Sequence, residues 1–137
     1  KVADTAVILL NAASGVEVGT EIVWEYVQNY QTPAFFVINQ MDQPKADFET
    51  TLEQAVNRFG NKVIPIQYPC NSGEKFNSII DVLRMTMYVF PENGGKPEKM
   101  PIPASELEKA NALHNALVEA AAENEEGLME KYFEKGN

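Results

Sequence analysis

Residues 35–42 read FFVINQMD, an apolar run that ends in a short, mostly polar segment. An apolar run without alternating polar residues is typical of a strand buried on both faces, as in a parallel sheet. In open α/β sheets, ligands bind at the carboxyl ends of such strands. The stretch therefore predicts a strand over residues 34–38 that delivers the polar residues 39–42 to a ligand.

A second apolar run, AVILL at residues 6–10, lies upstream and ends in the loop-like sequence NAASG. Between the two runs, an amphipathic pattern predicts a helix over residues 20–30 that Thr20 caps. Asp47 opens a further helix, which Gly60 closes. We therefore expect an α/β fold with two adjacent parallel strands, a helix crossing between them, and a sheet that is covered on both sides.

The pattern changes after Gly60. Residues 63–68 are extended and contain a proline, which suits an edge strand. Further strands are predicted over residues 79–83 and 85–90. Residues 91–97, PENGGKP, have the composition of a turn at the tip of a hairpin. This part of the chain is therefore expected to form a small α+β unit.

The C-terminal region predicts a helix with an acidic surface. Ser105, with Glu108 three residues later, matches the capping-box pattern at a helix start. On one continuous helix, six glutamates would form a stripe: Glu108, Glu119, Glu123, Glu126, Glu130 and Glu134. This stripe is either a solvated face or a surface for a partner. Residues 124–126 also resemble a helix start, and a division into two helices would split the stripe.

Composition limits the classes of function. The net charge is −9, and residues 105–137 contain eight acidic and three basic side chains. Such a chain is not expected to track nucleic-acid phosphates, whereas a basic protein partner fits it. The single cysteine, Cys70, excludes an internal disulfide and a Cys-based zinc site. No secretory signal and no membrane-spanning run is recognisable, so a cytoplasmic location is expected.

The polar residues after the second apolar run have side chains that suit a guanine base. The two oxygens of the Asp42 carboxylate can accept from the N1–H and the exocyclic amino group of guanine together. Adenine has an acceptor at N1 and no amino group beside it, so the same carboxylate would face a lone pair. Asn39, three residues earlier, supplies a donor and an acceptor for the base or for neighbouring loops.

The order Asn39-Gln40-Met41-Asp42 resembles the Asn-Lys-x-Asp motif with which GTPases read guanine, with Gln40 in place of the lysine. The sequence around it, DTAVILLNAASGV at residues 4–16 and ADF at 46–48, resembles bacterial elongation factor G. Segments further along, such as VIPIQYP at residues 63–69, resemble the G-prime insert of that family. The resemblance covers essentially the whole chain and identifies it as a member of this group of translational GTPases.

The resemblance implies a division into two parts. Residues 1–59 would be the C-terminal part of a GTP-binding domain, and residues 60–137 most of the G-prime insert. The implied ligand is GTP or GDP, with Mg²⁺ held by parts of a longer protein outside these residues. The implied partner is the ribosome, and Glu119 and Glu123 are the candidates for contact with its stalk protein. The longer protein would promote translocation during protein synthesis.

Phosphate chemistry is not expected from these residues alone. The 137 residues contain no Gly-x-x-x-x-Gly-Lys-Ser/Thr loop and no Asp-x-x-Gly segment, which the family uses for the phosphates. We predict no catalytic residue and no metal ligand in this stretch. Gln40 leaves two readings open: a tolerated change in a working site, or a ribosome-binding paralogue with a relaxed or non-hydrolysing nucleotide site. Ribosome-protection and release factors of the same family, and an unrelated flavodoxin-like binding domain, are the remaining alternatives.

Overall fold

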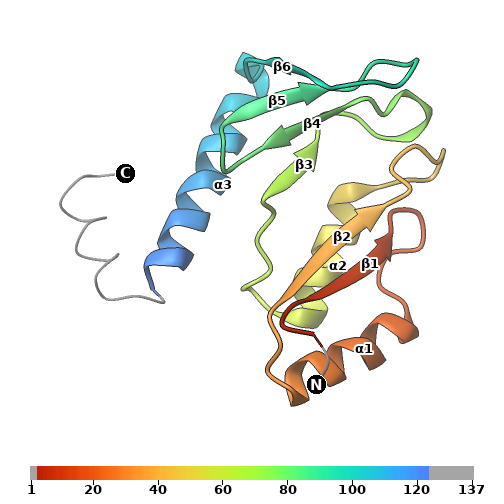
Figure 1. The fold of residues 1–137 in the computed structure, drawn as a ribbon, viewed down its shortest axis with the longest axis vertical. Helices are drawn as coiled ribbons and strands as arrows, with labels where there is room; N and C mark the ends of the chain where they lie inside the picture. Colours follow the sequence, from red (N-terminus) through yellow and green to blue (C-terminus); the bar gives the residue numbers. More distant parts are fainter. Residues whose placement is uncertain (1–2, 124–137) are drawn as a thin grey trace. The chain divides into compact units, whose positions relative to one another are not determined.

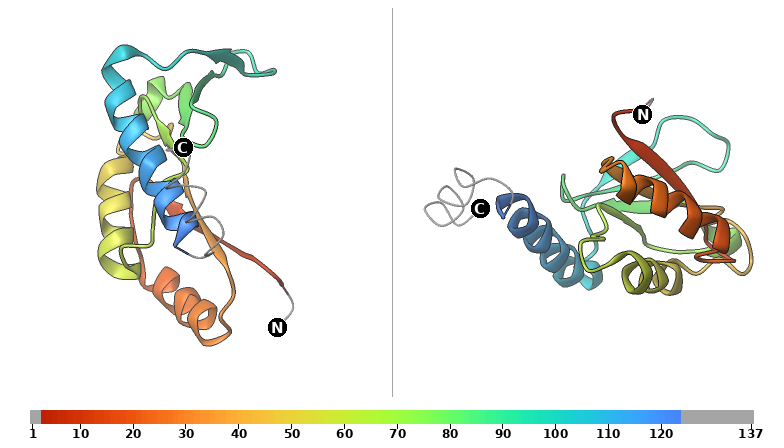
Figure 2. Two further views of the ribbon diagram at one scale, coloured as in Figure 1. Left: turned by 90° about the vertical axis from the view of Figure 1, so that its left-hand side faces the viewer. Right: turned by 90° about the horizontal axis from the view of Figure 1, so that it is seen from below.

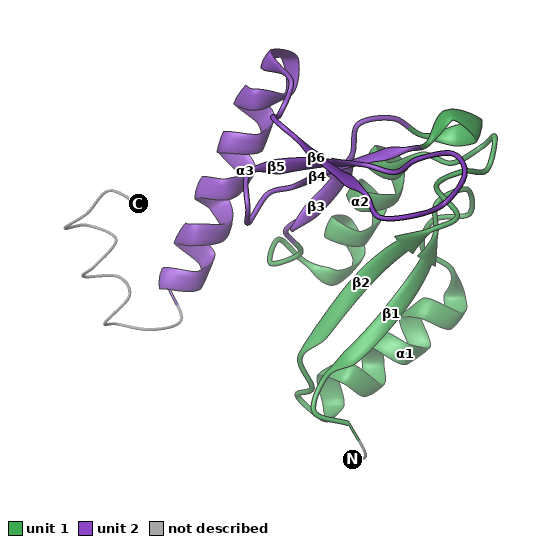
Figure 3. Ribbon diagram, turned by 45° about the horizontal axis from the view of Figure 1, so that its top comes forward, with its two compact units in different colours: residues 1–63, 72–76 green, residues 64–71, 77–137 purple. Residues whose placement is uncertain are grey.

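The computed structural model describes residues 3–123 and places in them six strands, three α-helices and one short 3₁₀ helix, η1, at Gly73–Lys75 (Figure 1). The chain forms two compact units (Figure 3). Unit 1 comprises residues 1–63 and 72–76, and unit 2 comprises residues 64–71 and 77–137. The assignment of residues 60–137 to a G-prime insert stays a prediction.

Unit 1 is built on two parallel strands. β1 (Ala6–Asn11) pairs in register with β2 (Ala34–Asn39), and α1 (Val18–Asn29) connects them. α2 (Phe48–Phe59) follows β2. The predicted parallel pair and its crossing helix are therefore confirmed.

Both helices cover the same face of this pair, and Figure 2 shows them from two further directions. Trp24 of α1 and Phe59 of α2 both pack on Phe36 of β2, with ring centroids 5.4 and 4.8 Å away. A salt bridge between Arg58 and Glu21 also joins the two helices. On the covered face Ile8 and Leu10 of β1 are buried, at 4% and 1% exposed.

The opposite face of the pair is open. The odd-numbered apolar residues on it are exposed, namely Val7 at 64%, Leu9 at 63%, Phe35 at 54% and Val37 at 42%. The strand register sets Val7 beside Phe35 and Leu9 beside Val37, so these side chains form one apolar patch. The expectation that this sheet is covered on both sides is therefore wrong for the described residues of unit 1, because both helices pack on one face.

Of the three helix boundaries that the sequence predicts in unit 1, two are confirmed. Asp47 caps α2, since its carboxylate accepts from the backbone N–H and the hydroxyl of Thr50 at 2.9 and 2.8 Å. Gly60 ends α2 with a φ of 105°, a conformation that glycine adopts without strain. The predicted cap at Thr20 is wrong: α1 starts earlier, with Glu17 at the N-cap and no side-chain cap bond.

Unit 2 contains a four-stranded antiparallel sheet with the order β3-β4-β5-β6. Its strands are β3 (Gln67–Pro69), β4 (Ser78–Asp81), β5 (Thr86–Val89) and β6 (Glu98–Met100). Only the end of the stretch predicted as extended over residues 63–68 is a strand: β3 lies at the edge of the sheet, but Pro65 lies outside it. The turn predicted at residues 91–97 does join two paired strands, but β6 was not predicted because its sequence, EKM, has no apolar pattern.

The hairpin between β4 and β5 is organised by a buried carboxylate. Asp81 accepts from the backbone N–H of Arg84 at 2.9 Å and from its guanidinium at 3.2 Å. Gln67 donates to the same carboxylate at 3.4 Å. Burial of this carboxyl group raises its pKa, but the hydrogen bonds and the charge of Arg84 outweigh that effect, and the net pKa is lowered.

α3 (Ala104–Ala122) begins at Pro103, whose carbonyl accepts from the N–H of Glu106 at 2.9 Å. Ser105 and Glu108 therefore lie inside the helix, and the predicted capping box is wrong. The residues of the acidic stripe from Glu126 onward lie outside the described residues. Between residues 3 and 123, no helix combines the length and apolarity that a membrane crossing requires.

α3 closes the core of unit 2. Tyr68 is 1% exposed; its hydroxyl donates to the carbonyl of Glu106 at 3.4 Å, and Lys109 lies 4.5 Å above its ring. Nδ1 of His114 lies 2.8 Å from the carbonyl oxygen of Val82. Because a carbonyl only accepts, this nitrogen carries the proton and donates. These contacts tie the helix to the sheet.

Candidate functional site

The candidate site is built from the two loops that leave the carboxyl ends of β1 and β2. The last residues of the two strands, Asn11 and Asn39, are partners in the strand register. Beyond them, the N–H of Ala12 donates to the carbonyl of Asn39 at 2.9 Å, and the N–H of Asp47 donates to the carbonyl of Ala12 at 2.9 Å. The first loop is thus bonded to both ends of the second.

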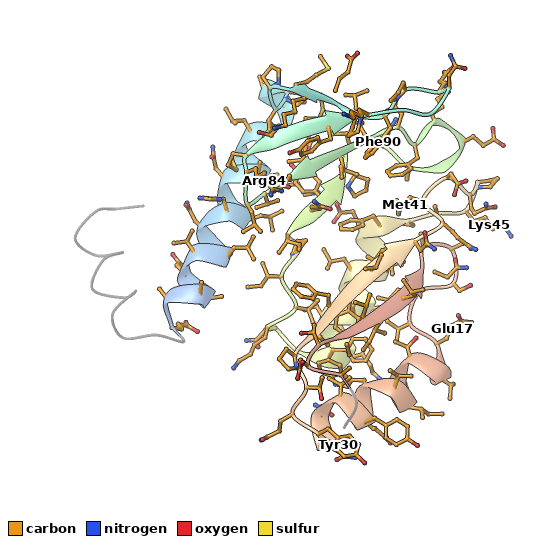
Figure 4. The ribbon with its side chains drawn as sticks, viewed as in Figure 1. Glu17, Tyr30, Met41, Lys45, Arg84 and Phe90 are labelled. Carbon is orange, nitrogen blue, oxygen red and sulfur yellow. The ribbon has the colours of Figure 1, made fainter. Side chains whose placement is uncertain are left out.

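The second loop is anchored by its third residue. Met41 is 7% exposed, and its carbonyl accepts from the N–H of Gly73 at 2.8 Å. Gln40, just before it, has a φ of 60°, which non-glycine residues adopt infrequently. Figure 4 labels Met41 and Lys45 in this loop; the first is buried and the second exposed. A buried methionine between exposed neighbours fixes which side chains of the loop face outward.

The three residues predicted to read guanine lie in that outward-facing group. Asn39, Gln40 and Asp42 are all exposed. Within residues 3–123, the side chains of Asn39 and Asp42 have no hydrogen-bond partner. A carboxylate and an amide that are not committed to the protein are free to bind the edge of a base.

Sequence reasoning missed Asn11. Its Oδ1 accepts from the backbone N–H groups of Ala13 and Ser14 at 2.8 and 3.2 Å, which forms the turn after β1. Its Nδ2 donates to Oε1 of Gln40 at 2.6 Å. The one available signal was the position of Asn11 at the end of an apolar strand, in the place that Asn39 has after the other.

α2 supports the first loop through its own side chains. Gln54 accepts from the N–H of Val16 at 2.9 Å, and Gly15 lies so close to the same side chain that an added Cβ would collide with it. Gly15 also has a φ of 72°, so the turn requires glycine there. The hydrogen bonds that Thr50 donates lower the pKa of Asp47, the cap of this helix.

The other predicted contact residues belong to unit 2. Glu119 and Glu123 are exposed and lie four residues apart at the end of α3, where the N–H of Glu123 donates to the carbonyl of Glu119 at 3.0 Å. Within residues 3–123 no group of three or more histidine, cysteine, aspartate or glutamate residues could hold a metal ion. The two predicted sites are thus on separate units.

Comparison with known families decides the family. Residues 1–135 match the family described as the elongation factor Tu GTP-binding domain. The chain belongs to that family. Its α/β fold, with a parallel β-α-β start and a small antiparallel sheet, is the fold of part of such a domain. Guanine nucleotide is therefore the ligand of this family of translational GTPases.

The chain is also similar to a solved structure. A protein from Thermus thermophilus is 31% identical in sequence and superimposes with a TM-score of 0.83 over 96% of this chain. The chain spans 19% of the length of that protein.

Proposed function

We propose that this chain is the guanine-reading part of a longer translational GTPase of the elongation factor G type. The observation that supports the proposal is the loop after β2, which presents Asn39 and Asp42 uncommitted and exposed at the carboxyl end of a parallel strand. Asp42 accepts from the N1–H and amino group of guanine, and Asn39 contacts the base or ties the loops around it. Gln40 lays its alkyl stem along the base.

The phosphates are bound elsewhere in the longer protein. These residues lack the phosphate loop and the segment that senses the γ-phosphate, so the chain contributes recognition rather than hydrolysis. Mg²⁺ would be held by those other parts together with the phosphates. The purified 137-residue chain should accordingly release no phosphate from GTP above buffer background, and phosphate release that a substitution in this chain abolishes would contradict the proposal.

Unit 2 acts as the part that meets the ribosome in this proposal. Glu119 and Glu123 place two like charges on one helical face, where they can attract a basic surface of the ribosomal stalk protein. The longer protein then couples guanine nucleotide binding to translocation.

A second candidate function rests on Gln40. A ribosome-binding paralogue with a relaxed nucleotide site would tolerate the loss of the lysine cation that the resembled motif has at this position. Translocation by the longer protein in the absence of measurable guanine nucleotide binding would favour this candidate. GTP hydrolysis by the longer protein, together with nucleotide binding that depends on Asp42, would exclude it.

The experiment that tests the proposal compares two variants that each remove one negative charge. Asp42→Asn in the longer protein should weaken GDP binding by about 10- to 100-fold, because an amide leaves one guanine donor unmatched and adds a donor of its own. Glu53→Gln removes a charge from the exposed surface of α2 and should leave the affinity unchanged. Titration of a fluorescent GDP derivative measures both. Equal affinities for wild type and Asp42→Asn would overturn the proposal.

A further inference from the structure

The side chain of Asn11 connects two features of the candidate site. It belongs to the turn after β1, through the bonds of its Oδ1 to the N–H groups of Ala13 and Ser14. It also reaches across to the loop after β2, through the 2.6 Å bond from its Nδ2 to Oε1 of Gln40. Asn11 and Gln40 are 29 positions apart, so the contact depends on the pairing of β1 and β2.

The bonds fix the orientation of both amides. Because two backbone donors occupy Oδ1 of Asn11, only its Nδ2 can face Gln40. Gln40 must therefore offer its oxygen, and the two N–H donors of its Nε2 remain uncommitted among residues 3–123. A flexible, exposed glutamine would otherwise sample many rotamers, and the bond from Asn11 restricts them before any ligand binds.

We propose that Asn11 is a positioning residue of the base-reading loop: it holds Gln40 by Oε1, so that the neutral amide donors of Gln40 are presented to acceptor groups of a bound guanine nucleoside. The proposal rests on the function proposed above. It explains how the loop works with glutamine where the resembled motif has lysine. It also means that Gln40 and position 11 act as a pair.

The pairing predicts an unusual response to substitution. An aspartate at position 11 still accepts from the N–H groups of Ala13 and Ser14, and aspartate is favoured in such turns. It cannot donate to Gln40, so Asn11→Asp keeps the turn, but the amide of Gln40 then turns over and donates to the carboxylate, which withdraws an N–H donor from the nucleoside. A lysine at position 40 requires an acceptor at position 11, because an ammonium group only donates. With Asn11 unchanged, the Nδ2 of Asn11 would face the ammonium group as a second donor.

The test is a double-mutant cycle in the longer protein, with a fluorescent GDP derivative as the probe. Asn11→Asp should weaken GDP binding by about 3- to 10-fold, the usual effect of one lost hydrogen bond. In a Gln40→Lys background the same substitution should instead strengthen binding by a similar factor, because the new carboxylate and the new ammonium group then form an ion pair. A residue that only shapes the turn would show no such reversal of sign.

Two further proteins separate the contact from the added charge. Asn11→Ser keeps an acceptor for the turn but is too short to reach Gln40, and it adds no charge. It should weaken GDP binding by about 3- to 10-fold, and it should have no further effect when Gln40 is replaced by alanine. Asn61→Asp, at an exposed position of unit 1, is the charge control and should bind GDP like wild type.

The outcomes distinguish this inference from the proposed function. If Asn11→Asp, Asn11→Ser and wild type bind GDP equally while Asp42→Asn binds weakly, the positioning role is wrong and the base-reading role stands. If Asn11→Asp weakens binding but Asn11→Ser does not, the effect is charge repulsion and the positioning role is again wrong. If Asp42→Asn also binds like wild type, the proposed function itself fails.

Discussion

The two sheets of this chain bury their apolar residues to different extents. In unit 2, Ile80 and Val82 are fully buried, and α3 contacts the sheet through Tyr68. In unit 1, Val7 and Leu9 remain more than 60% exposed on a face that no described element of this unit covers. Exposed apolar residues at this density on a strand pair mark a surface that another element covers. Unit 2 therefore buries its apolar residues within the chain, whereas unit 1, which carries the candidate base-reading loop, leaves one face of its strand pair exposed.

The largest predicted effect tests the closed core of unit 2. Tyr68→Ala should lower the free energy of unfolding by about 3–5 kcal/mol, because it removes a buried aromatic side chain and leaves a cavity. Tyr26→Ala, at a tyrosine that is 60% exposed, is the matched control and should cost less than about 1 kcal/mol. Urea unfolding of the 137-residue chain followed by circular dichroism measures both. Equal costs would mean that α3 does not close this core.

The open face of unit 1 gives the second prediction, at two adjacent residues of β1. Leu10→Ala should cost about 2–5 kcal/mol, because Leu10 is 1% exposed. Leu9→Ala should cost less than about 0.5 kcal/mol in the 137-residue chain, since Leu9 is 63% exposed. Trp24 is the one tryptophan and packs in unit 1, so its fluorescence follows this unit.

The same two substitutions, Leu10→Ala and Leu9→Ala, also test the open face of unit 1 in the longer protein. There Leu9→Ala should cost more than about 1 kcal/mol, because further elements bury the open face. A cost that stays below about 0.5 kcal/mol in both proteins would show that nothing covers this face, and unit 1 would then be complete as it stands.

The third prediction concerns the acidic end of α3. Reversing Glu119 and Glu123 to lysine should weaken binding of the longer protein to the ribosomal stalk protein by about 5- to 30-fold, or roughly 0.5–1 kcal/mol for each charge. The wild-type interaction should weaken as salt rises. Reversal of Glu92 and Glu98, which are exposed elsewhere in unit 2, is the control. If both double variants bind alike at low salt, the face of α3 is only solvated.

The smallest predicted effect is the pH dependence of unit 2. The pKa of Asp81 is lowered from 3.8 in the folded state, so the unfolded chain takes up its proton first as pH falls. The carboxylate contributes its full stabilisation at pH values above its ordinary pKa, and this stabilisation is lost as pH falls through the lowered pKa of the folded state. The stability difference between wild type and Asp81→Asn should therefore be constant above about pH 5 and shrink as pH falls below about 4. A constant difference would mean that the carboxylate charge contributes nothing.

The sequence predicted those features whose cause is local. Asp47 and Gly60 end α2 as expected because a cap depends on one side chain and its nearest backbone groups. The parallel pair was predictable from two apolar runs with a helical pattern between them. α3 starts before Ser105, with Pro103 at the N-cap and no side-chain cap bond, and the capping-box pattern did not predict that start.

The sequence did not predict features that depend on strand pairing or on how elements cover the sheet. The bond between Asn11 and Gln40 follows from the register of β1 and β2, which the sequence of either loop does not contain. β6 forms because it pairs with β5, not because its own residues favour a strand. The open face of unit 1 could not be predicted, since apolar runs look the same whether or not the covering elements belong to the chain.

A change of base tests most directly whether the carboxylate of Asp42 reads the nucleotide. Xanthine has a carbonyl where guanine has its amino group, so the amide of an Asp42→Asn variant can donate to it. The ratio of GDP to XDP affinity should be high for the wild-type longer protein and fall by about 100-fold or more in Asp42→Asn. Competition against a fluorescent nucleotide gives both ratios. If the two ratios are equal, this loop does not read guanine.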